Sequence, residues 1–202
     1  MDEQALIQAA QKGDLEAFNR LVLAYQDAIY THAYRMLGDE SAADDAAQEA
    51  FIAAYRGIKS FRGGSFRAWL FRIVSNQCYD EMRRQKRRPT TPLEPVTADD
   101  EEVESPYWIA DNSNSPEEKL DRQALIEAIQ HCLDGLPAEF RSVVLLVDVQ
   151  GMDYAEAAQV LGKPVGTIKS RLARARVRMQ HCLQGFWELL PEQFRLLDEA
   201  SS

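Results

Sequence analysis

Residues 151–178, GMDYAEAAQVLGKPVGTIKSRLARARVR, decide the fold of the C-terminal half of the chain. They predict a short helix over residues 153–161, a turn, and a second helix that opens at Gly166. Gly162 allows the left-handed conformation that a tight turn needs, and Pro164 cannot continue a helix. The stretch therefore indicates a helix-turn-helix. The first helix is expected to place three residues on one side: Ala157, Ala158 and Leu161.

The second of these helices is amphipathic and basic. Its apolar residues recur at i, i+4, i+7 and i+11, which predicts one buried stripe of Ile168, Leu172, Ala175 and Met179. Residues 163–178 carry six cations and no acid. The start of such a helix points at base edges in a major groove, although a solvated basic face on a bundle helix would carry similar charges. The residues expected to face outward are Lys169, Ser170, Arg171, Ala173 and Arg174.

Charge is arranged in blocks along the 202 residues, whose net charge is −9. Residues 56–88 hold ten Lys and Arg against two acids, and residues 89–121 hold ten Asp and Glu against one lysine. Two basic blocks around an acidic middle favour two separate nucleic-acid surfaces over a uniformly acidic enzyme.

Apolar spacing predicts helices throughout the N-terminal half. They are expected over 6–11, over 15–37, from a cap at Ser41 to about Ile58, and from Phe66 to about Arg88. The third of these helices has a predicted inward stripe of Ala47, Ala50, Phe51, Ala54 and Ile58, and an outward acidic surface of Asp44, Asp45, Gln48 and Glu49. An acidic patch suits protein docking, and a solvated helix face is the alternative.

Residues 89–115 are rich in Pro, Asp, Glu, Ser and Thr without a sustained period, and are interpreted as a linker. Ser115 and Pro116 then read as an N-cap and a first helical residue, and a further helix starts at Pro137. The predicted fold is all-α, with two small helical domains joined by a flexible acidic linker. The expected parts are a helical bundle over 1–88, the linker over 89–115, the helix-turn-helix domain over 116–184 and an extension over 185–202.

Aromatic residues alternate with cations between residues 55 and 79: Phe61, Phe66, Trp69 and Phe71. Trp69, Arg72 and Asn76 recur at i, i+3 and i+7 and share a helix face. Aromatic rings stack on unpaired bases while arginines neutralise phosphates, which favours a single-stranded nucleic-acid site. The alternative is that these aromatics fill the core of a four-helix domain. Five cations over residues 83–88 suit a phosphate backbone.

The cysteines and the chain ends predict a reduced, cytoplasmic setting. No segment is apolar for long enough to span a membrane, and the N-terminus lacks the basic start of a signal peptide. Cys78, Cys132 and Cys182 are too few and too scattered for a disulfide framework.

The sequence predicts no enzyme, no cofactor and no metal site. Gln-His-Cys-Leu occurs at 130–133 and again at 180–183, which invites a zinc hypothesis. Neighbouring helix residues diverge by about 100°, so a single His-Cys pair does not converge on one ion, and all four ligands would have to meet in space. No phosphate-binding glycine loop, Gly-x-Ser-x-Gly or metalloprotease motif is present. His32, on an apolar helix, is expected to be structural.

Four segments in order resemble one family: DAAQEAF at 45–51, FRG at 61–63, FRAWLFRI at 66–73 and PVGTIKSRLARAR at 164–176. The chain is similar to the extracytoplasmic-function sigma factors, the two-domain initiation subunits of bacterial RNA polymerase. The resemblance runs from about Leu6 to Leu183. It implies a protein that directs promoter-specific transcription initiation. The implied partners are core RNA polymerase, promoter DNA and an anti-sigma factor, with a monomer when free.

The resemblance also implies roles for residues. The residues that it implies for docking on the polymerase clamp helices are Asp44, Asp45, Gln48, Glu49 and Phe51. The residues that it implies for binding the melted −10 element are Phe61, Arg67, Trp69, Arg72 and Asn76. Of these, Phe61 and Asn76 are at the positions that hold a flipped base. The residues that it implies for reading the duplex −35 element are Thr167, Lys169, Ser170, Arg171 and Arg174. The acidic linker would run toward the RNA exit channel, and a plain solvated tether is the alternative.

Two features depart from the family pattern. Ala155 and Ala157 replace the acidic and larger aliphatic residues usual in the first helix of the helix-turn-helix. The apolar residues of the extension, such as Phe186 and Trp187, are expected to fold back on their own domain rather than to bind a partner.

Two other function classes are open to the sequence alone. A stand-alone helix-turn-helix regulator would explain residues 151–178 but leaves residues 44–88 without a role, and such regulators commonly dimerise on palindromes. An interaction-only adaptor is the third class, and DNA binding by the second domain would exclude it.

Overall fold

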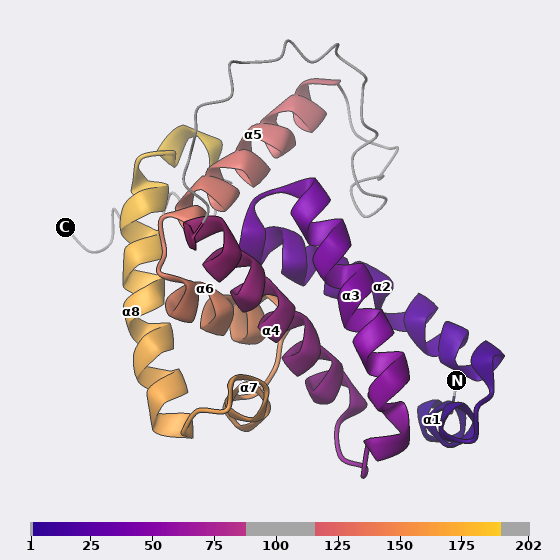
Figure 1. The fold of residues 1–202 in the computed structure, drawn as a ribbon. Coiled ribbons are helices and arrows are strands. Elements are labelled where there is room, and N and C mark those ends of the chain that lie inside the picture. The colour runs from indigo at the N-terminus through magenta and orange to yellow at the C-terminus, as the bar shows by residue number, and fades with distance from the viewer. Residues whose placement is uncertain (1, 88–115, 191–202) are drawn as a thin grey trace.

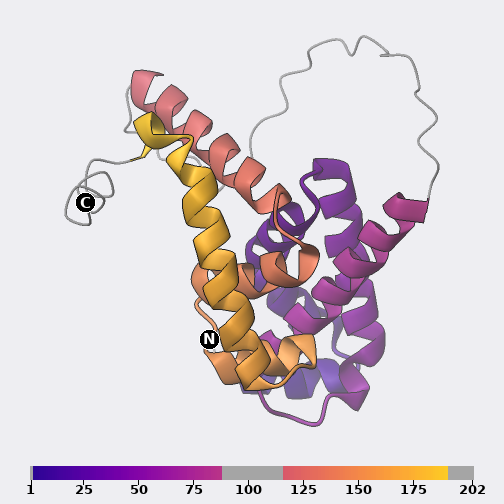
Figure 2. The same cartoon turned by 90° about the vertical axis from the view of Figure 1, so that its left-hand side faces the viewer.

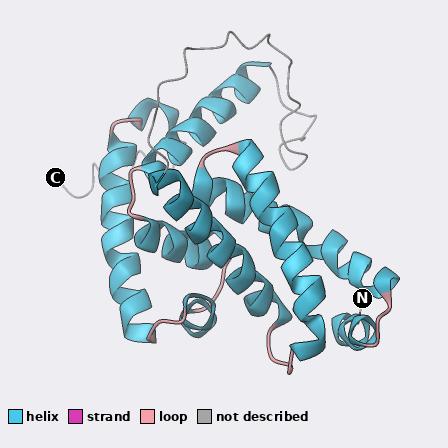
Figure 3. Cartoon of the chain, in the orientation of Figure 1, coloured by secondary structure: helices cyan, strands magenta, loops and turns pink. Residues whose placement is uncertain are grey.

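The computed structural model describes residues 2–87 and 116–190, and every regular element within those ranges is helical (Figures 1 and 3). The N-terminal range contains α1 (Glu3–Gln11), α2 (Leu15–Leu37), α3 (Glu40–Gly57), the 3-10 turn η1 (Ile58–Ser60) and α4 (Phe66–Arg87). The C-terminal range contains α5 (Pro116–Asp134), α6 (Ala138–Val144), the π-helical η3 (Leu145–Val149), α7 (Tyr154–Leu161), α8 (Val165–Gln184) and the 3-10 turn η4 (Trp187–Leu189). The predicted all-α fold is confirmed. Ser115 and the predicted linker lie outside the described residues.

Aspartates set the starts of the first three helices. The carboxylates of Asp2, Asp14 and Asp39 each accept a hydrogen bond from the backbone N–H three residues later. Such a cap is worth about 1 kcal/mol to a helix. The prediction that Ser41 caps α3 was wrong, because Asp39 offers an equally good acceptor two residues earlier and the helix begins at Glu40.

Helices α2, α3 and α4 pack together as the core of the N-terminal bundle, with α1 against α2 (Figure 1). The buried face of α3 is almost entirely alanine: Ala43, Ala46, Ala47, Ala50 and Ala54. Since alanine adds only a methyl group, neighbouring helices approach this face closely. The predicted inward stripe is confirmed, with Ile58 buried and Phe51 half-buried.

His32 is fully buried between α2 and α4. Its Nε2 lies 3.0 Å from the Ser75 hydroxyl, and its ring meets the Phe71 ring edge-on. Its Nδ1 finds no hydrogen-bond partner among the described residues. Burial lowers the pKa of His32 to about 4, so the side chain stays neutral at ordinary pH and serves the core.

The helix-turn-helix forms as the sequence predicts, with small shifts. Asp153 and Glu156 form a capping box at the start of α7, and Gly162 ends the helix at φ 60°. The second helix begins at Val165, one residue before the predicted start. Val160, which the predicted buried side omitted, is 3% exposed, whereas the predicted Leu161 is only half-buried, because Val160 follows Ala157 by three residues on the inner face. The predicted stripe on α8 is buried at Ile168, Leu172 and Ala175, and Met179 packs at its edge.

The two domains pack against each other, a contact that the prediction of two domains on a flexible tether did not contain. α7 lies against α4, and α5 lies against α2 (Figures 1 and 2). The Tyr79 hydroxyl on α4 lies 2.7 Å from the Ser142 hydroxyl on α6. The two domains are therefore in direct contact, and polar side chains form hydrogen bonds across that contact.

Arg141 on α6 is the most engaged of these polar groups. Its Nη1 donates to the Met36 carbonyl at 2.6 Å and to the Asp134 carboxylate at 2.9 Å. Its Nη2 donates to the Asp134 carbonyl at 2.8 Å. Beside it, Arg35 Nη1 donates to the Gln130 side-chain carbonyl at 3.1 Å. One arginine of the C-terminal domain thus reaches the last turn of α2 in the N-terminal domain.

A disulfide joins Cys132 on α5 to Cys182 on α8, a single bond that the expectation of no disulfide framework did not contain. They are 50 residues apart in sequence, but the fold places their Cα atoms 5.6 Å apart. Only Cys78 is a free thiol, and it is buried. Sequence spacing did not reveal the pair because α5 and α8 meet only in the folded domain.

Replacing Arg141 by alanine should lower the free energy of unfolding by roughly 2–4 kcal/mol, because buried carbonyls and the Asp134 carboxylate lose their donor. Urea unfolding measures the effect. Arg20→Ala is the matched control, since the Arg20–Glu16 pair is exposed and worth less than about 0.5 kcal/mol. Equal losses in the two variants would contradict the role of Arg141.

Acid should destabilise the protein through His32. The pKa of His32 is lower in the folded chain than its unfolded value, so the unfolded state binds the proton first as pH falls. This one group should remove about 2 kcal/mol of stability between pH 7.5 and pH 5, with the loss continuing until about pH 4. Urea unfolding at both pH values, repeated with His32→Gln, isolates the effect. A pH slope that the substitution leaves unchanged would exclude His32 as its source.

Candidate nucleic-acid interface

The start of α8 presents a polar, basic surface. Lys169, Ser170 and Arg174 are exposed and Thr167 is half-buried, whereas Ile168 and Leu172 face the core. The Lys169 ammonium lies over the Tyr154 ring, 5.5 Å from its centre, and the Ser170 hydroxyl donates to the Thr167 carbonyl. The helix end that points at base edges in helix-turn-helix proteins is therefore accessible here.

Arg171 is held differently from the other four predicted −35 residues. Its guanidinium forms an ion pair of 2.7 Å with the Glu139 carboxylate on α6, and its side chain is 22% exposed. Arg176, further along α8, pairs with Asp148. Arg171 is therefore partly engaged by a protein carboxylate, whereas Lys169 and Arg174 beside it are exposed.

An aromatic cluster occupies the start of α4. Phe61 and Trp69 have ring centres 5.3 Å apart, and both pack on Phe66. Phe66 and Phe71 are buried, so for these two the alternative of core aromatics holds. Phe61 and Trp69 are half-buried and keep part of their rings at the surface. Trp69 also packs against Gly57, where an added Cβ would lie 3.3 Å from the indole.

The predicted −10 residues fall into two groups. Phe61 and Trp69 lie together in the aromatic cluster, whereas Arg72 and Asn76 are exposed further along α4. Asn76 follows Trp69 by seven residues, about two helical turns. Arg67 is half-buried, lies over the Phe71 ring and donates to the Gln150 carbonyl in the C-terminal domain. Like Arg171, it is engaged by a protein group.

The acidic surface of α3 is exposed as predicted at Asp44, Asp45, Gln48 and Glu49. Phe51, the fifth predicted docking residue, lies instead toward the core, where it lines a small cavity with Phe18 and Leu21. Its side chain is thus less available than those of the four polar residues.

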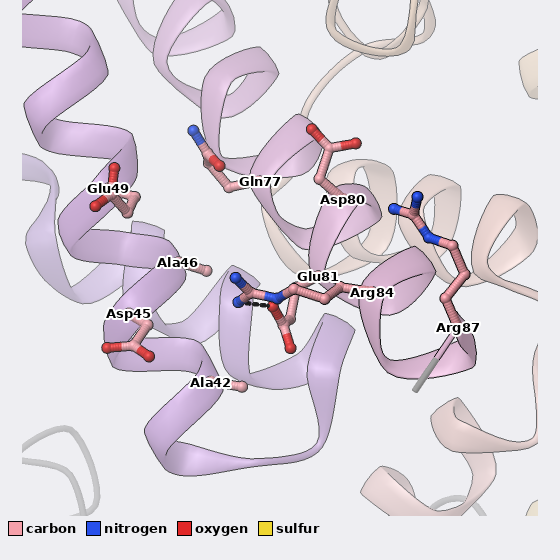
Figure 4. Close-up of a pocket in the computed structure, with 9 residues that line it drawn as sticks. All are labelled: Ala42, Asp45, Ala46, Glu49, Gln77, Asp80, Glu81, Arg84 and Arg87. Atoms are coloured by element: carbon pink, nitrogen blue, oxygen red, sulfur yellow. Dashed lines mark hydrogen bonds and ion pairs between the residues drawn. The ribbon is translucent and has the colours of Figure 1, made fainter. Parts of the chain in front are cut away.

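A charged groove adjoins this acidic surface, between α3 and the C-terminal half of α4 (Figure 4). Its volume is about 380 Å³. On its α4 side the Glu81 carboxylate pairs with Arg84, three residues further along the same helix. The residues lining it are Ala42, Asp45, Ala46, Glu49, Gln77, Asp80, Glu81, Arg84 and Arg87. The sequence predicted a basic tail that contains Arg84 and Arg87 but no groove; the acids at 80 and 81, the first acidic residues of α4, were the available signal for a mixed surface.

Two family descriptions match the chain in order. Residues 21–88 match sigma-70 region 2 and residues 126–179 match sigma-70 region 4. The chain is 37% identical over 183 residues to the RNA polymerase sigma-H factor of Pseudomonas aeruginosa, covering 90% of this chain and 94% of that protein. It is 37% identical over 188 residues to the ECF RNA polymerase sigma-E factor of Escherichia coli K12, covering 91% and 95%.

Solved structures agree with these relatives. The structure of CnrH in complex with the cytosolic domain of CnrY matches with a TM-score of 0.66 and 27% identity, over 91% of this chain and 97% of that one. The sigma factor RpoE, in complex with the anti-sigma factor NepR from Bartonella quintana, matches with a TM-score of 0.62 and 25% identity, over 84% and 98%. A region 2 bundle followed by a region 4 helix-turn-helix defines a sigma-70-type protein. The chain belongs to the extracytoplasmic-function sigma factors.

Two absences apply to the described parts of the chain. None of their helices is both long and apolar enough to cross a membrane. They also contain no group of three or more His, Cys, Asp or Glu arranged to hold a metal ion.

Proposed function

We propose that this chain is a sigma factor that binds core RNA polymerase and directs initiation at specific promoters. One observation carries the proposal: a single chain joins an exposed acidic α3, an aromatic and basic α4, and a helix-turn-helix with an exposed basic start. The chemistry of RNA synthesis stays with the polymerase, so the sigma factor needs no catalytic group, and it acts in the bacterial cytoplasm. The parts proposed are region 2 over 1–88, a linker over 89–115, region 4 over 116–184 and an extension over 185–202.

Region 4 is proposed to fix the complex on duplex DNA at the −35 element. Exposed Lys169 and Arg174 supply positive charge for phosphates, and polar groups at the helix start reach base edges. The full set proposed is Thr167, Lys169, Ser170, Arg171 and Arg174.

Region 2 is proposed to trap the melted −10 strand. Half-buried Phe61 and Trp69 offer ring faces to unstacked bases, while exposed Arg72 and half-buried Arg67 lie close to the strand's phosphates. Asn76 supplies a side-chain amide for a flipped base. Polymerase binding together with base capture drives the melting.

The acidic surface of α3 is proposed as the docking site for the polymerase. Asp44, Asp45, Gln48 and Glu49 are exposed, and a basic partner surface would complement them. Phe51 is kept as a contact at the edge of this surface, although its ring packs inward. Because CnrH and RpoE were solved with CnrY and the anti-sigma factor NepR, we also propose an anti-sigma partner for this chain.

Reconstitution tests the function directly. The purified chain is mixed with core polymerase and assayed for co-elution, then for initiation on a promoter selected from a genomic library. Asp45→Arg combined with Glu49→Arg should abolish co-elution, whereas the matched variant Glu16→Arg, on the exposed side of α2, should not. Operator binding without any affinity for core polymerase would instead support the alternative, a stand-alone regulator.

Arg171→Ala should reduce discrimination between the selected −35 sequence and a scrambled one by roughly 1–3 kcal/mol, if its guanidinium contacts a base edge. Competition binding on the two duplexes measures this difference. Glu139→Ala, which removes the carboxylate that pairs with Arg171, should leave the discrimination intact. An equal loss on all sequences would reassign Arg171 to a phosphate.

Asn76→Ala should relax selectivity at one −10 position without weakening the polymerase complex, because Asn76 is exposed on α4 and does not line the groove beside the acidic surface of α3. Transcription from a set of −10 point variants gives the selectivity, and co-elution gives the affinity. Reduced affinity for core polymerase would count against the pocket assignment.

A further inference from the structure

The two Gln-His-Cys-Leu segments have no role in the proposed function, yet the fold brings their cysteines together. Cys132 lies in the last turn of α5 and Cys182 in the last turn of α8, and their sulfurs are bonded. Of the adjacent histidines, His131 packs its ring against Phe186. Because the two sulfurs are bonded to each other, the pair forms a thiol–disulfide site.

The two cysteine residues differ in their exposure to solvent. Cys132 is 2% exposed, whereas Cys182 is only half-buried. Thiol–disulfide exchange requires attack on or by a sulfur that the small molecule can reach. Cys182 is therefore the sulfur that meets solvent reagents, and Cys132 is the resolving partner beneath it. Burial raises the pKa of the remaining thiol, Cys78, to about 12 and keeps it unreactive.

We propose that Cys132 and Cys182 form a reversible redox switch. When oxidised, the pair fixes α5 to α8, the second helix of the helix-turn-helix, and stabilises the contact between the two domains. The proposal rests on the proposed function, because RNA polymerase works inside the cell, where small thiols keep most cysteines reduced. A disulfide formed in that compartment is characteristically transient and redox-sensing.

The oxidation is a two-electron exchange with a small-molecule disulfide. The Cys182 thiolate attacks one sulfur of that disulfide, forms a mixed disulfide and releases one small thiolate. The Cys132 thiol then gives up its proton, and its sulfur attacks Cys182 and expels the second small thiolate. The two thiolates take up the two protons that the cysteines lost. Two protein thiols are thus oxidised, one small disulfide is reduced to two thiols, and excess small thiol reverses both steps.

The disulfide bears on the domain contact through α5. Cys132 lies between Gln130 and Asp134, the α5 residues that engage Arg35 and Arg141. Arg141 in turn donates to the Met36 carbonyl of α2. Linking α5 to α8 therefore fixes the helix that carries these contacts to the helix that reads DNA.

The closed arrangement occupies a group that DNA would need, because Arg67 donates to the Gln150 carbonyl across the domain contact. The Arg171–Glu139 pair lies within the C-terminal domain and does not depend on the closure. Oxidation, by stabilising this arrangement, lowers binding to polymerase and promoter, and reduction restores it.

Equilibrating the full chain in mixtures of reduced and oxidised glutathione tests the switch. Thiols counted after acid quenching and unfolding should fall from three to one as the mixture becomes oxidising. The oxidised chain should melt at a temperature higher by roughly 10 °C or more, because the cross-link restricts the unfolded state. Small-angle X-ray scattering should give a larger radius of gyration for the reduced chain, and the oxidised chain should bind core polymerase several-fold more weakly.

Cys182→Ser supplies the permanently reduced form. It should match the reduced chain in melting temperature and radius of gyration and ignore the glutathione ratio. Cys78→Ala, which keeps the pair, should retain the full response. A thiol count that never changes in the folded chain, or identical radii and polymerase affinities in both redox states, would overturn the proposal. A chain that switches its thiol count, melting temperature and radius but never binds polymerase would retain the switch and refute the sigma-factor function.

Discussion

The contact between Arg141 and the last turn of α2 determines how the two halves of this chain relate. A buried guanidinium needs hydrogen-bond acceptors, and the two terminal nitrogens of Arg141 find them in the Met36 carbonyl of one domain and in Asp134 of the other, while its Nε has no partner among the described residues. Because a buried cation without partners is costly, α6 is held where these acceptors are. The packing of α7 against α4 and the hydrogen bond from Arg67 to the Gln150 carbonyl join the same two domains elsewhere.

Local features of the fold could be predicted from the sequence because their causes are local. Gly162 ends α7 in the left-handed conformation that the turn requires, and the spacing of Ile168, Leu172 and Ala175 gives the buried stripe of α8. The misplaced cap at Ser41 shows the limit of such reasoning, since Asp39 is an equally suitable acceptor and only packing selects between them. The domain contact and the Cys132–Cys182 bond could not be predicted, because they join residues far apart in sequence whose spacing carries no period.

In the candidate site, too, some features could be predicted from local sequence patterns and others could not. Periodicity placed Lys169, Arg174, Asp45 and Glu49 at the surface, where the structure also has them. It could not separate aromatics that stack on bases from aromatics that fill the core, and the structure divides them, with Phe66 and Phe71 buried and Phe61 and Trp69 partly exposed. The pairing of Arg171 with Glu139 depends on α6, 32 residues away, and lay beyond any pattern within α8.

One face of α3 consists of alanines that pack into the bundle, and the opposite face carries the polar residues that are proposed to bind the polymerase. The buried contacts of α3 with the bundle are made mostly by the methyl groups of Ala43, Ala46, Ala47, Ala50 and Ala54, with the half-buried Phe51 ring beside them. The opposite side can therefore exchange one set of polar residues for another without any change inside the bundle. Such a helix lets a lineage of related proteins diversify what it docks on while the scaffold stays constant.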